Sequence, residues 1–290
     1  MSKINEGTLW EKDSKWLRES RKDLWNPDYF TFLVKHVWKI DKAMKIVDFG
    51  CGIGYLASVL LPLLPEGSTY TGLDISGMLL EEARAAFKDS EWQTEFIEQD
   101  LTEYVPEQKY DIAICQSLLI HIPSPASILE KMMQSVISGG RVICIEPNWA
   151  VTTTGVSTYR HGMEVLSYYD WGLCQKLLED GNRNSDVDRY IGIKIPAIMH
   201  DLGLKNIDIR VNDKATFNFR EPDKKTKEEI AEKRSKPYYQ TKQYTDAGLT
   251  DDEAKRHIEG IIKTEDFEDE RDEPLLIVGT GAWLVSFGEK

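Results

Sequence analysis

The sequence has few cysteines and no hydrophobic run long enough to span a membrane. Its longest apolar run, residues 53–64, is interrupted by Pro62 and falls short of the ~20 residues that a membrane helix needs. The four cysteines lie far apart and form no CxxC pair: they are Cys51, Cys115, Cys144 and Cys174. This spacing argues against a zinc site and against a disulfide framework. Because the first residues, MSKINEGTLW, lack the apolar core of a signal peptide, a cytoplasmic protein without a membrane span is expected.

Positive charge is also scarce. The 290 residues include 36 Lys and Arg against 49 Asp and Glu, which gives a formal net charge of -13. Nucleic-acid binding draws much of its affinity from Lys and Arg side chains that neutralise phosphates. The composition therefore argues against a nucleic-acid partner. Hydrophobic residues make up 41% of the chain, which is enough for one large core.

Strand and helix patterns alternate through the first half of the chain and resume near its end. The expected strands are 45–49, 69–73, 94–98, 111–115, 141–145, 206–211 and 282–287, and the expected helices are 54–64, 76–87, one that starts after Ser124, and 195–202. Runs such as VICI, which are apolar at every position, indicate a parallel sheet covered on both faces. The expected fold is an α/β three-layer sandwich.

Three segments precede or interrupt this alternation. They are residues 1–43, 148–194 and 220–279. We expect them to form helical cap elements on a single domain that spans residues 1–290. A helix is expected over 162–181, and Thr250 with Glu253 fits a capping box at the start of another. The acidic run TEDFEDERDE is expected to be a solvated loop.

The stretch IVDFGCGIGYL combines an acidic residue with three alternating glycines. These residues are Asp48, Gly50, Gly52 and Gly54. Glycines at a strand-to-helix turn let the backbone approach a ligand closely, and the first amides of the helix then face that ligand. A turn without a ligand rarely needs three glycines, so a nucleotide or nucleoside site is favoured. A dinucleotide site of the G-x-G-x-x-G type is the alternative, but Tyr55 stands at its third glycine position.

The D-x-G-x-G-x-G spacing resembles the first motif of the class I S-adenosylmethionine-dependent methyltransferases. Later segments resemble the same family in the expected order: YTGLDIS after the second strand, IEQDLTEY after the third, YDIAICQSLLIHI at the fourth and GGRVICIEP at the fifth. The resemblance implies a Rossmann-like, mostly parallel seven-stranded sheet whose last strand, AWLVSF, is antiparallel. It also implies S-adenosyl-L-methionine as the cofactor and a small-molecule branch similar to quinone-biosynthesis enzymes.

By the same resemblance, the cofactor-binding residues follow the ends of the first four strands. They would be Asp48, Gly50, Cys51, Gly52, Gly54, Asp74, Ile75, Met78, Asp100, Leu101 and Gln116. Asp74 would accept hydrogen bonds from both ribose hydroxyls, and Ile75 and Met78 would flank the adenine. Asp100 would accept the adenine amino group; its alternative role is to stabilise a turn.

Fewer residues are predicted to act on the methyl acceptor. His121 follows the fourth strand, where its imidazole is suited to general base catalysis, although it could equally cap the turn before Pro123. Candidate substrate residues are Tyr29, Glu146, Tyr159 and His161. Aromatic side chains in 148–190 favour an aromatic or quinone-like acceptor. We expect methyl transfer to a small molecule without a metal; the alternatives are an NAD(P)-dependent oxidoreductase and a non-catalytic sensor of S-adenosylmethionine.

Overall fold

The computed structural model describes residues 24–149, 156–160, 163–165, 170–183, 187–221, 226–269, 274–281 and 283–290. The chain divides into two compact units. Unit 1 comprises Met1–Asn148, Tyr190–Lys214 and Trp283–Lys290, and unit 2 comprises Trp149–Arg189 and Ala215–Ala282. Unit 2 therefore consists of two insertions into the chain of unit 1.

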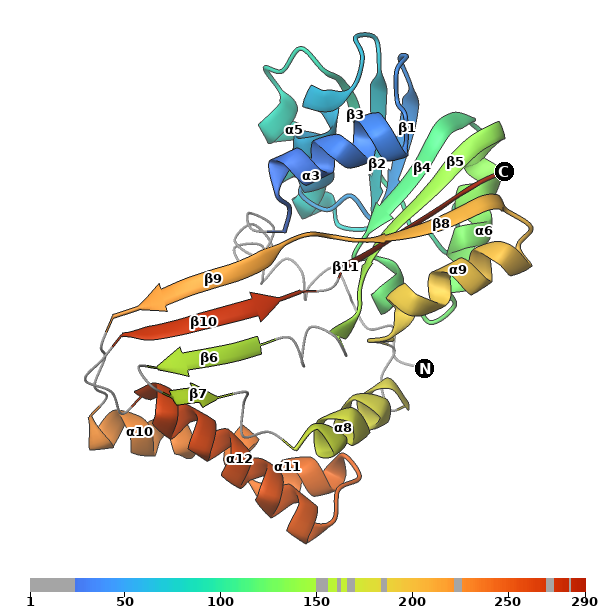
Figure 1. The fold of residues 1–290 in the computed structure, drawn as a ribbon. Helices are drawn as coiled ribbons and strands as arrows, with labels where there is room; N and C mark the ends of the chain where they lie inside the picture. Colours follow the sequence, from blue (N-terminus) through green and yellow to red (C-terminus); the bar gives the residue numbers. More distant parts are fainter. Residues whose placement is uncertain are drawn as a thin grey trace. The chain divides into compact units, whose positions relative to one another are not determined.

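Unit 1 is built on a sheet of seven strands (Figure 1). In chain order they are β1 Lys45–Phe49, β2 Thr69–Asp74, β3 Gln93–Glu98, β4 Tyr110–Gln116, β5 Val136–Pro147, β8 Lys205–Val211 and β11 Trp283–Glu289. Their order across the sheet is β3-β2-β1-β4-β5-β11-β8. β11 runs antiparallel to β5 and β8, and the remaining pairs are parallel. This confirms the expected mostly parallel seven-stranded sheet with a reversed last strand.

Helices pack on this sheet in two groups. They are α3 Pro27–Phe32, the π-helix η1 Leu33–Val37, α4 Tyr55–Leu60, the 3-10 helix η2 Leu61–Leu63, α5 Gly77–Phe87, the 3-10 helix η3 Leu119–His121, α6 Pro125–Ser135 and α9 Ile191–Asp201. The buried side chains of α3, η1, α4 and α5 share one hydrophobic core with β1, β2, β5 and β11. α6 and α9 pack against each other and against β5. The sheet thus holds its strand ends in fixed positions for the turns that follow them.

Unit 2 contains a second sheet in addition to helices. Its strands are β6 Val156–Arg160, β7 Met163–Val165, β9 Ala215–Arg220 and β10 Leu275–Thr280, in the order β7-β6-β10-β9 and all antiparallel. Its helices are α8 Trp171–Arg183, α10 Lys227–Arg234, the 3-10 helix η4 Pro237–Tyr239, α11 Thr241–Asp246 and α12 Asp251–Asp269. The insertions are therefore not only helical. Residues 163–165 are strand where a helix was expected, and the acidic residues 264–269 belong to α12, not to a loop.

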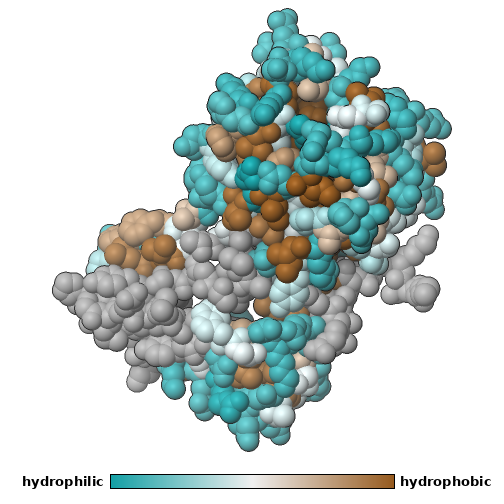
Figure 2. Space-filling view, turned by 45° about the vertical axis from the view of Figure 1, so that its right-hand side comes forward, coloured by the Kyte–Doolittle hydropathy of each residue, from teal (hydrophilic) through white to brown (hydrophobic). Residues whose placement is uncertain are grey.

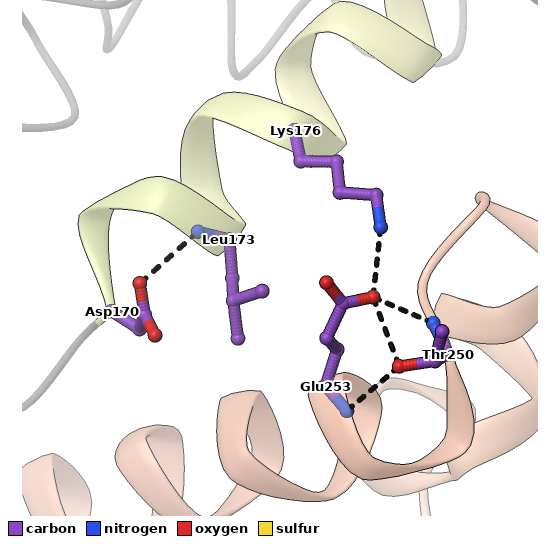
Figure 3. Close-up of polar contacts among 5 residues, drawn as sticks. All are labelled: Asp170, Leu173, Lys176, Thr250 and Glu253. Atoms are coloured by element: carbon purple, nitrogen blue, oxygen red, sulfur yellow. Dashed lines mark hydrogen bonds and ion pairs between the residues drawn. The ribbon is translucent and has the colours of Figure 1, made fainter.

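The start of α12 is tied to α8 by polar contacts (Figure 3). Glu253 Oε2 accepts hydrogen bonds from Lys176 Nζ at 2.8 Å and from the Thr250 amide at 2.8 Å, and Thr250 Oγ1 in turn accepts from the Glu253 amide at 3.3 Å. This confirms the capping box expected from the sequence. Leu173 and Ile258 are among the buried residues that pack between the same two helices.

The surface in the view of Figure 2 is largely hydrophilic where it is described, and hydrophobic residues gather in a few patches. Exposed large apolar side chains include Ile75 and Met78 in unit 1 and Phe217, Phe219 and Val278 in unit 2. Among the described helices, none is long and apolar enough to cross a bilayer.

Candidate functional site

A cavity of about 180 Å³ lies in unit 1 at the carboxyl ends of β1, β2 and β4. It brings together most of the cofactor residues expected from the sequence, together with the expected base: Asp48, Gly50, Cys51, Gly52, Asp74, Ile75, Asp100, Leu101, Gln116 and His121. Gly54 and Met78 do not line it. Ser117, Leu118 and Tyr55 line it as well, although the sequence did not single them out as site residues.

The glycine turn between β1 and α4 uses its glycines in different ways. All three have positive φ, with values of 73°, 51° and 75° along the turn. A Cβ built on Gly52 meets nothing within 4 Å, so the backbone here is open to the cavity. A Cβ on Gly54 would lie 3.3 Å from Ala83 Cβ and Phe87 Cε2, so this glycine lets α5 pack closely. The turn therefore exposes its backbone to the cavity at Gly52 and packs tightly against α5 at Gly54.

Asp74, at the end of β2, is bound to the glycine turn. Its Oδ2 accepts the Gly52 amide at 2.8 Å, and its Oδ1 accepts the Ser76 amide at 2.9 Å. Burial raises the pKa of this carboxyl above its ordinary value, and hydrogen bonds from the backbone amides of Ser76, Gly52 and Ile75 oppose that shift. The two carboxylate oxygens together offer about four lone-pair sites, more than these amides use. The side chain is thus held in place with acceptor capacity left for a ligand.

Asp48, at the end of β1, is fully buried beside the cavity. Its Oδ2 accepts a hydrogen bond from the hydroxyl of Tyr70, which is also buried. Burial raises the pKa of Asp48 to about 8. Cys51, next in the turn, has a thiol pKa raised well above its usual value by burial and by the two neighbouring aspartates, so it remains a neutral apolar wall of the cavity.

The turn after β3 is fixed by two side chains. Asp100 Oδ1 accepts hydrogen bonds from the Thr102 amide at 2.8 Å and from Thr102 Oγ1 at 2.7 Å. Lys131 Nζ donates to the Leu101 carbonyl at 3.0 Å and to the Thr102 carbonyl at 2.5 Å. Asp100 therefore stabilises a turn, as one reading of the sequence had it, and it also lines the cavity. Its role toward a ligand stays a prediction.

The segment after β4 is bound to the side chain of Glu146 by hydrogen bonds. The Glu146 side chain has no exposed surface; its Oε1 accepts the amides of Leu118 and Leu119 at 2.8 Å each, and its Oε2 accepts the Ile120 amide at 3.3 Å. These bonds fix η3, the short helix that carries His121. Glu146 does not line the cavity, so the structure places this candidate substrate residue in a supporting position. No residue pattern indicates this role, because the partners are backbone amides in the segment that follows β4.

Ser117 adopts an unusual backbone conformation at the wall of the cavity. Its φ is 56°, a value that a residue with a side chain rarely adopts. Within the described structure, the buried Oγ of Ser117 and Oε1 of the adjacent Gln116 have no hydrogen-bond partner. Such backbone strain concentrates at functional sites.

The remaining candidates are not among the described residues that line the cavity. Tyr29, in α3, donates its hydroxyl hydrogen bond to the Val211 carbonyl at 2.7 Å, and burial raises its pKa. Tyr159 belongs to β6 of unit 2, and His161 lies outside the described residues. Within the described part of the chain, no group of three or more His, Cys, Asp or Glu side chains could hold a metal ion.

Residues 47–142 match the family described as a methyltransferase domain, and this range contains every residue of the cavity. The chain contains a class I S-adenosylmethionine-dependent methyltransferase domain. The ubiquinone biosynthesis O-methyltransferase of Klebsiella pneumoniae subsp. pneumoniae is 34% identical to it over 100 residues, which cover 34% of this chain and 40% of that protein. The chain spans only 30% to 40% of the length of the curated relatives it matches first.

Solved structures share the fold of the methyltransferase domain. Protein BH2331 of Bacillus halodurans C-125 superposes with a TM-score of 0.51 at 14% identity and covers 90% of this chain and 98% of that chain. The [4+2]-cyclase SpnF superposes with a TM-score of 0.53 at 14% identity and covers 98% of this chain and 95% of its own. At such low identity, these likenesses show the fold alone.

Proposed function

We propose that the protein binds S-adenosyl-L-methionine in the cavity of unit 1 and transfers its methyl group to a small-molecule acceptor. The observation that carries this proposal is the charge of the cavity. Asp48, Asp74 and Asp100 line it, and its described lining contains no Lys or Arg. A cofactor with a net positive charge suits these carboxyls, whereas the pyrophosphate of NAD(P) would meet them without a counter-charge.

The residues present also fit the shape of this cofactor. Gly52 leaves open space where any side chain would enter the cavity. Asp74 is oriented by two amides and can accept both hydroxyl groups of a ribose. Ile75, about half exposed at 51%, offers an apolar surface beside it. These residues would hold the nucleoside part of the cofactor.

When bound, S-adenosyl-L-methionine would supply a sulfonium methyl group, which the acceptor attacks in line while S-adenosylhomocysteine leaves. The protein's own contribution is to align the acceptor and to exclude water. His121 lines the cavity on η3 and is the candidate general base for an acceptor with an acidic O–H group. Glu146 acts as a positioning residue, because it fixes the helix that carries His121.

We further propose that the acceptor is aromatic or quinone-like. Support comes from the similarity to a ubiquinone biosynthesis O-methyltransferase and from the aromatic residues of the insertions. The family match ends at residue 142, so the segments 148–194 and 220–279 lie outside it. Tyr29, Tyr159 and His161 remain candidates for contact with the acceptor.

Two measurements test the function. Calorimetric titration with S-adenosylhomocysteine and with NADH identifies the cofactor: binding of S-adenosylhomocysteine supports the proposal, and binding of NADH alone overturns it in favour of an oxidoreductase. A screen of phenols, quinones and amines with radiolabelled donor then tests for transfer. Because a fold does not determine its reaction, firm binding without transfer to any acceptor would favour the sensor hypothesis.

A further inference from the structure

Asp48 stands out among the carboxyls of the cavity because only part of its hydrogen-bonding capacity is used. It lies in the middle of the sheet, paired with Gly72 of β2 and Ile114 of β4, and is 1% exposed. Tyr70 donates its hydroxyl hydrogen bond to Oδ2. Oδ1 is buried and has no hydrogen-bond partner within the described structure. By contrast, both oxygens of Asp74 accept backbone amides.

No described cation offsets a charge on Asp48. The titratable groups that interact with it are Tyr70 and Asp74 on β2, Cys51 on the glycine turn and Cys115 on β4. Burial holds the pKa values of Tyr70, Cys51 and Cys115 well above their usual range, so these groups are neutral. Arg84 lowers the pKa of Cys51 slightly and is not among the groups that shift the pKa of Asp48. A buried carboxylate in such surroundings is disfavoured, and the pKa of Asp48 accordingly rises to about 8.

We propose that Asp48 and Tyr70 form a charge-selective pair that makes the site prefer the cationic methyl donor over its neutral demethylated product. The inference rests on the proposed function. A net positive charge in the cavity favours the carboxylate, so Asp48 releases one proton to solvent when the donor binds. After the positive charge has left with the methyl group, the buried carboxylate is again without a counter-charge and takes one proton back from solvent. Product release is thereby eased.

Tyr70 sets the pH at which this exchange occurs. Its hydroxyl donates to the carboxylate and so favours the charged form, against the effect of burial. Removing the hydroxyl should raise the pKa of Asp48 further. At a given pH, Asp48 would then be protonated in a larger fraction of the ligand-free protein. The affinity for the donor would reach its maximum only at a higher pH.

Calorimetric titration with S-adenosylmethionine and with S-adenosylhomocysteine, from about pH 6 to 9, tests the pair through proton linkage. For the wild-type protein, donor affinity should rise by up to about tenfold per pH unit and level off near the pKa of free Asp48. Affinity for the product should change little. Titrations in two buffers of different ionisation enthalpy should show proton release for the donor alone.

Two variants and a control separate this role from a structural one. Asp48→Asn should flatten the pH profile and shrink the preference for donor over product. Tyr70→Phe should move the plateau of donor affinity to higher pH. If Asp48→Asn does not fold, Tyr70→Phe alone tests the proposal. Tyr110→Phe is the matched control, because Tyr110 is also buried and its hydroxyl bonds to Gln108, outside the cavity. This control should leave the profile unchanged.

The outcomes distinguish the two proposals. If donor and product both bind but share one pH profile, or if Tyr70→Phe leaves the plateau where it was, the charge-selective pair is overturned and the proposed function stands. If neither ligand binds at any pH, the proposed function itself fails.

Discussion

At the scale of single residues, the glycine turn makes Gly52 the position where a side chain would collide with a ligand and with nothing else. We predict that Gly52→Val abolishes binding of S-adenosylhomocysteine while the fold persists, because the added Cβ points into the cavity. Calorimetry measures binding and urea unfolding measures stability. The left-handed backbone, with φ of 51°, should cost about 1–3 kcal/mol of unfolding free energy.

Gly139 provides a matched control for that backbone strain. It also has a positive φ, 75°, and a Cβ there also meets nothing within 4 Å, but it lies outside the cavity. Gly139→Val should therefore lose a similar amount of stability and bind the cofactor product normally. Equal loss of binding in both variants would show that strain, and not contact with the ligand, explains the Gly52 result.

Sequence alone could place Asp48, Gly52 and Asp74 in one site, because each lies at or just beyond the end of a strand whose apolar run is easy to recognise. The same reasoning could not assign Glu146 correctly. Its partners are backbone amides about thirty positions earlier in the chain, and these hydrogen bonds leave no residue pattern. Ser117 was likewise hidden, since a serine gives no sign of a positive φ.

Glu146 stabilises a whole helical turn, because its carboxylate accepts backbone amides at the start of η3. Glu146→Ala should lower the unfolding free energy by about 2–5 kcal/mol, since it takes the acceptor from three amides, two of them buried. Glu146→Gln keeps one acceptor and should fold, with a lower kcat and nearly unchanged donor affinity because His121 is less well positioned. The exposed Glu130 gives a control on α6, and Glu130→Gln should change neither quantity. A loss of donor affinity with normal kcat in Glu146→Gln would contradict the positioning role.

At the scale of elements, α12 shows where sequence patterns fail. Its acidic end was expected to be a loop, because like charges repel along a helix. In the structure, Lys233 Nζ lies 3.0 Å from Glu265 Oε1, and Arg234 pairs with Asp266, so α10 supplies the opposite charges. Such pairing between distant segments is invisible to a local pattern. β10, in contrast, contains the apolar run LLIV and could have been recognised.

The contact between α8 and α12 predicts a pH dependence of stability. Lys176 and the Thr250 amide lower the pKa of Glu253 to about 2 from an ordinary 4.5. A group whose pKa falls on folding stabilises the folded state above its unfolded pKa and loses that effect as the pH drops toward the folded value. The destabilisation caused by Glu253→Gln should therefore be full above pH 4.5 and shrink toward about 2.

Urea unfolding of the wild type and of Glu253→Gln at a series of pH values measures this difference. Asp246→Asn is the control: Asp246 pairs with Lys242 on α11, but both side chains are largely exposed, at 66% and 78%. Exposed pairs of this kind contribute little. A Glu253→Gln effect that does not change with pH would refute the assignment of Lys176 and Thr250 as its cause.

At the scale of the whole molecule, the cavity belongs to unit 1. All the described residues that line it lie in that unit, and the family match ends before the first residue of unit 2. The sequence predicted the sheet of unit 1 because buried parallel strands read as continuous apolar runs. It did not indicate the sheet of unit 2, because this sheet pairs β6 and β7 of one insertion with β9 and β10 of the other, and pairing between distant segments leaves no local pattern.

This division predicts a separable response in hydrogen exchange. S-adenosylhomocysteine should slow exchange in the glycine turn and in the segments 74–79 and 116–122, because a ligand that binds only the folded state suppresses local opening around its contacts. The helices α8 and α12 of unit 2 should not respond to it. An acceptor that transfer assays identify should slow exchange in unit 2 only when the cofactor product is also present, if the insertions recognise the acceptor as we propose. Mass spectrometry of peptides from the four states measures this. An acceptor that protects unit 1 alone would assign its recognition to η3 and the cavity wall, and the insertions would have no part in choosing the substrate.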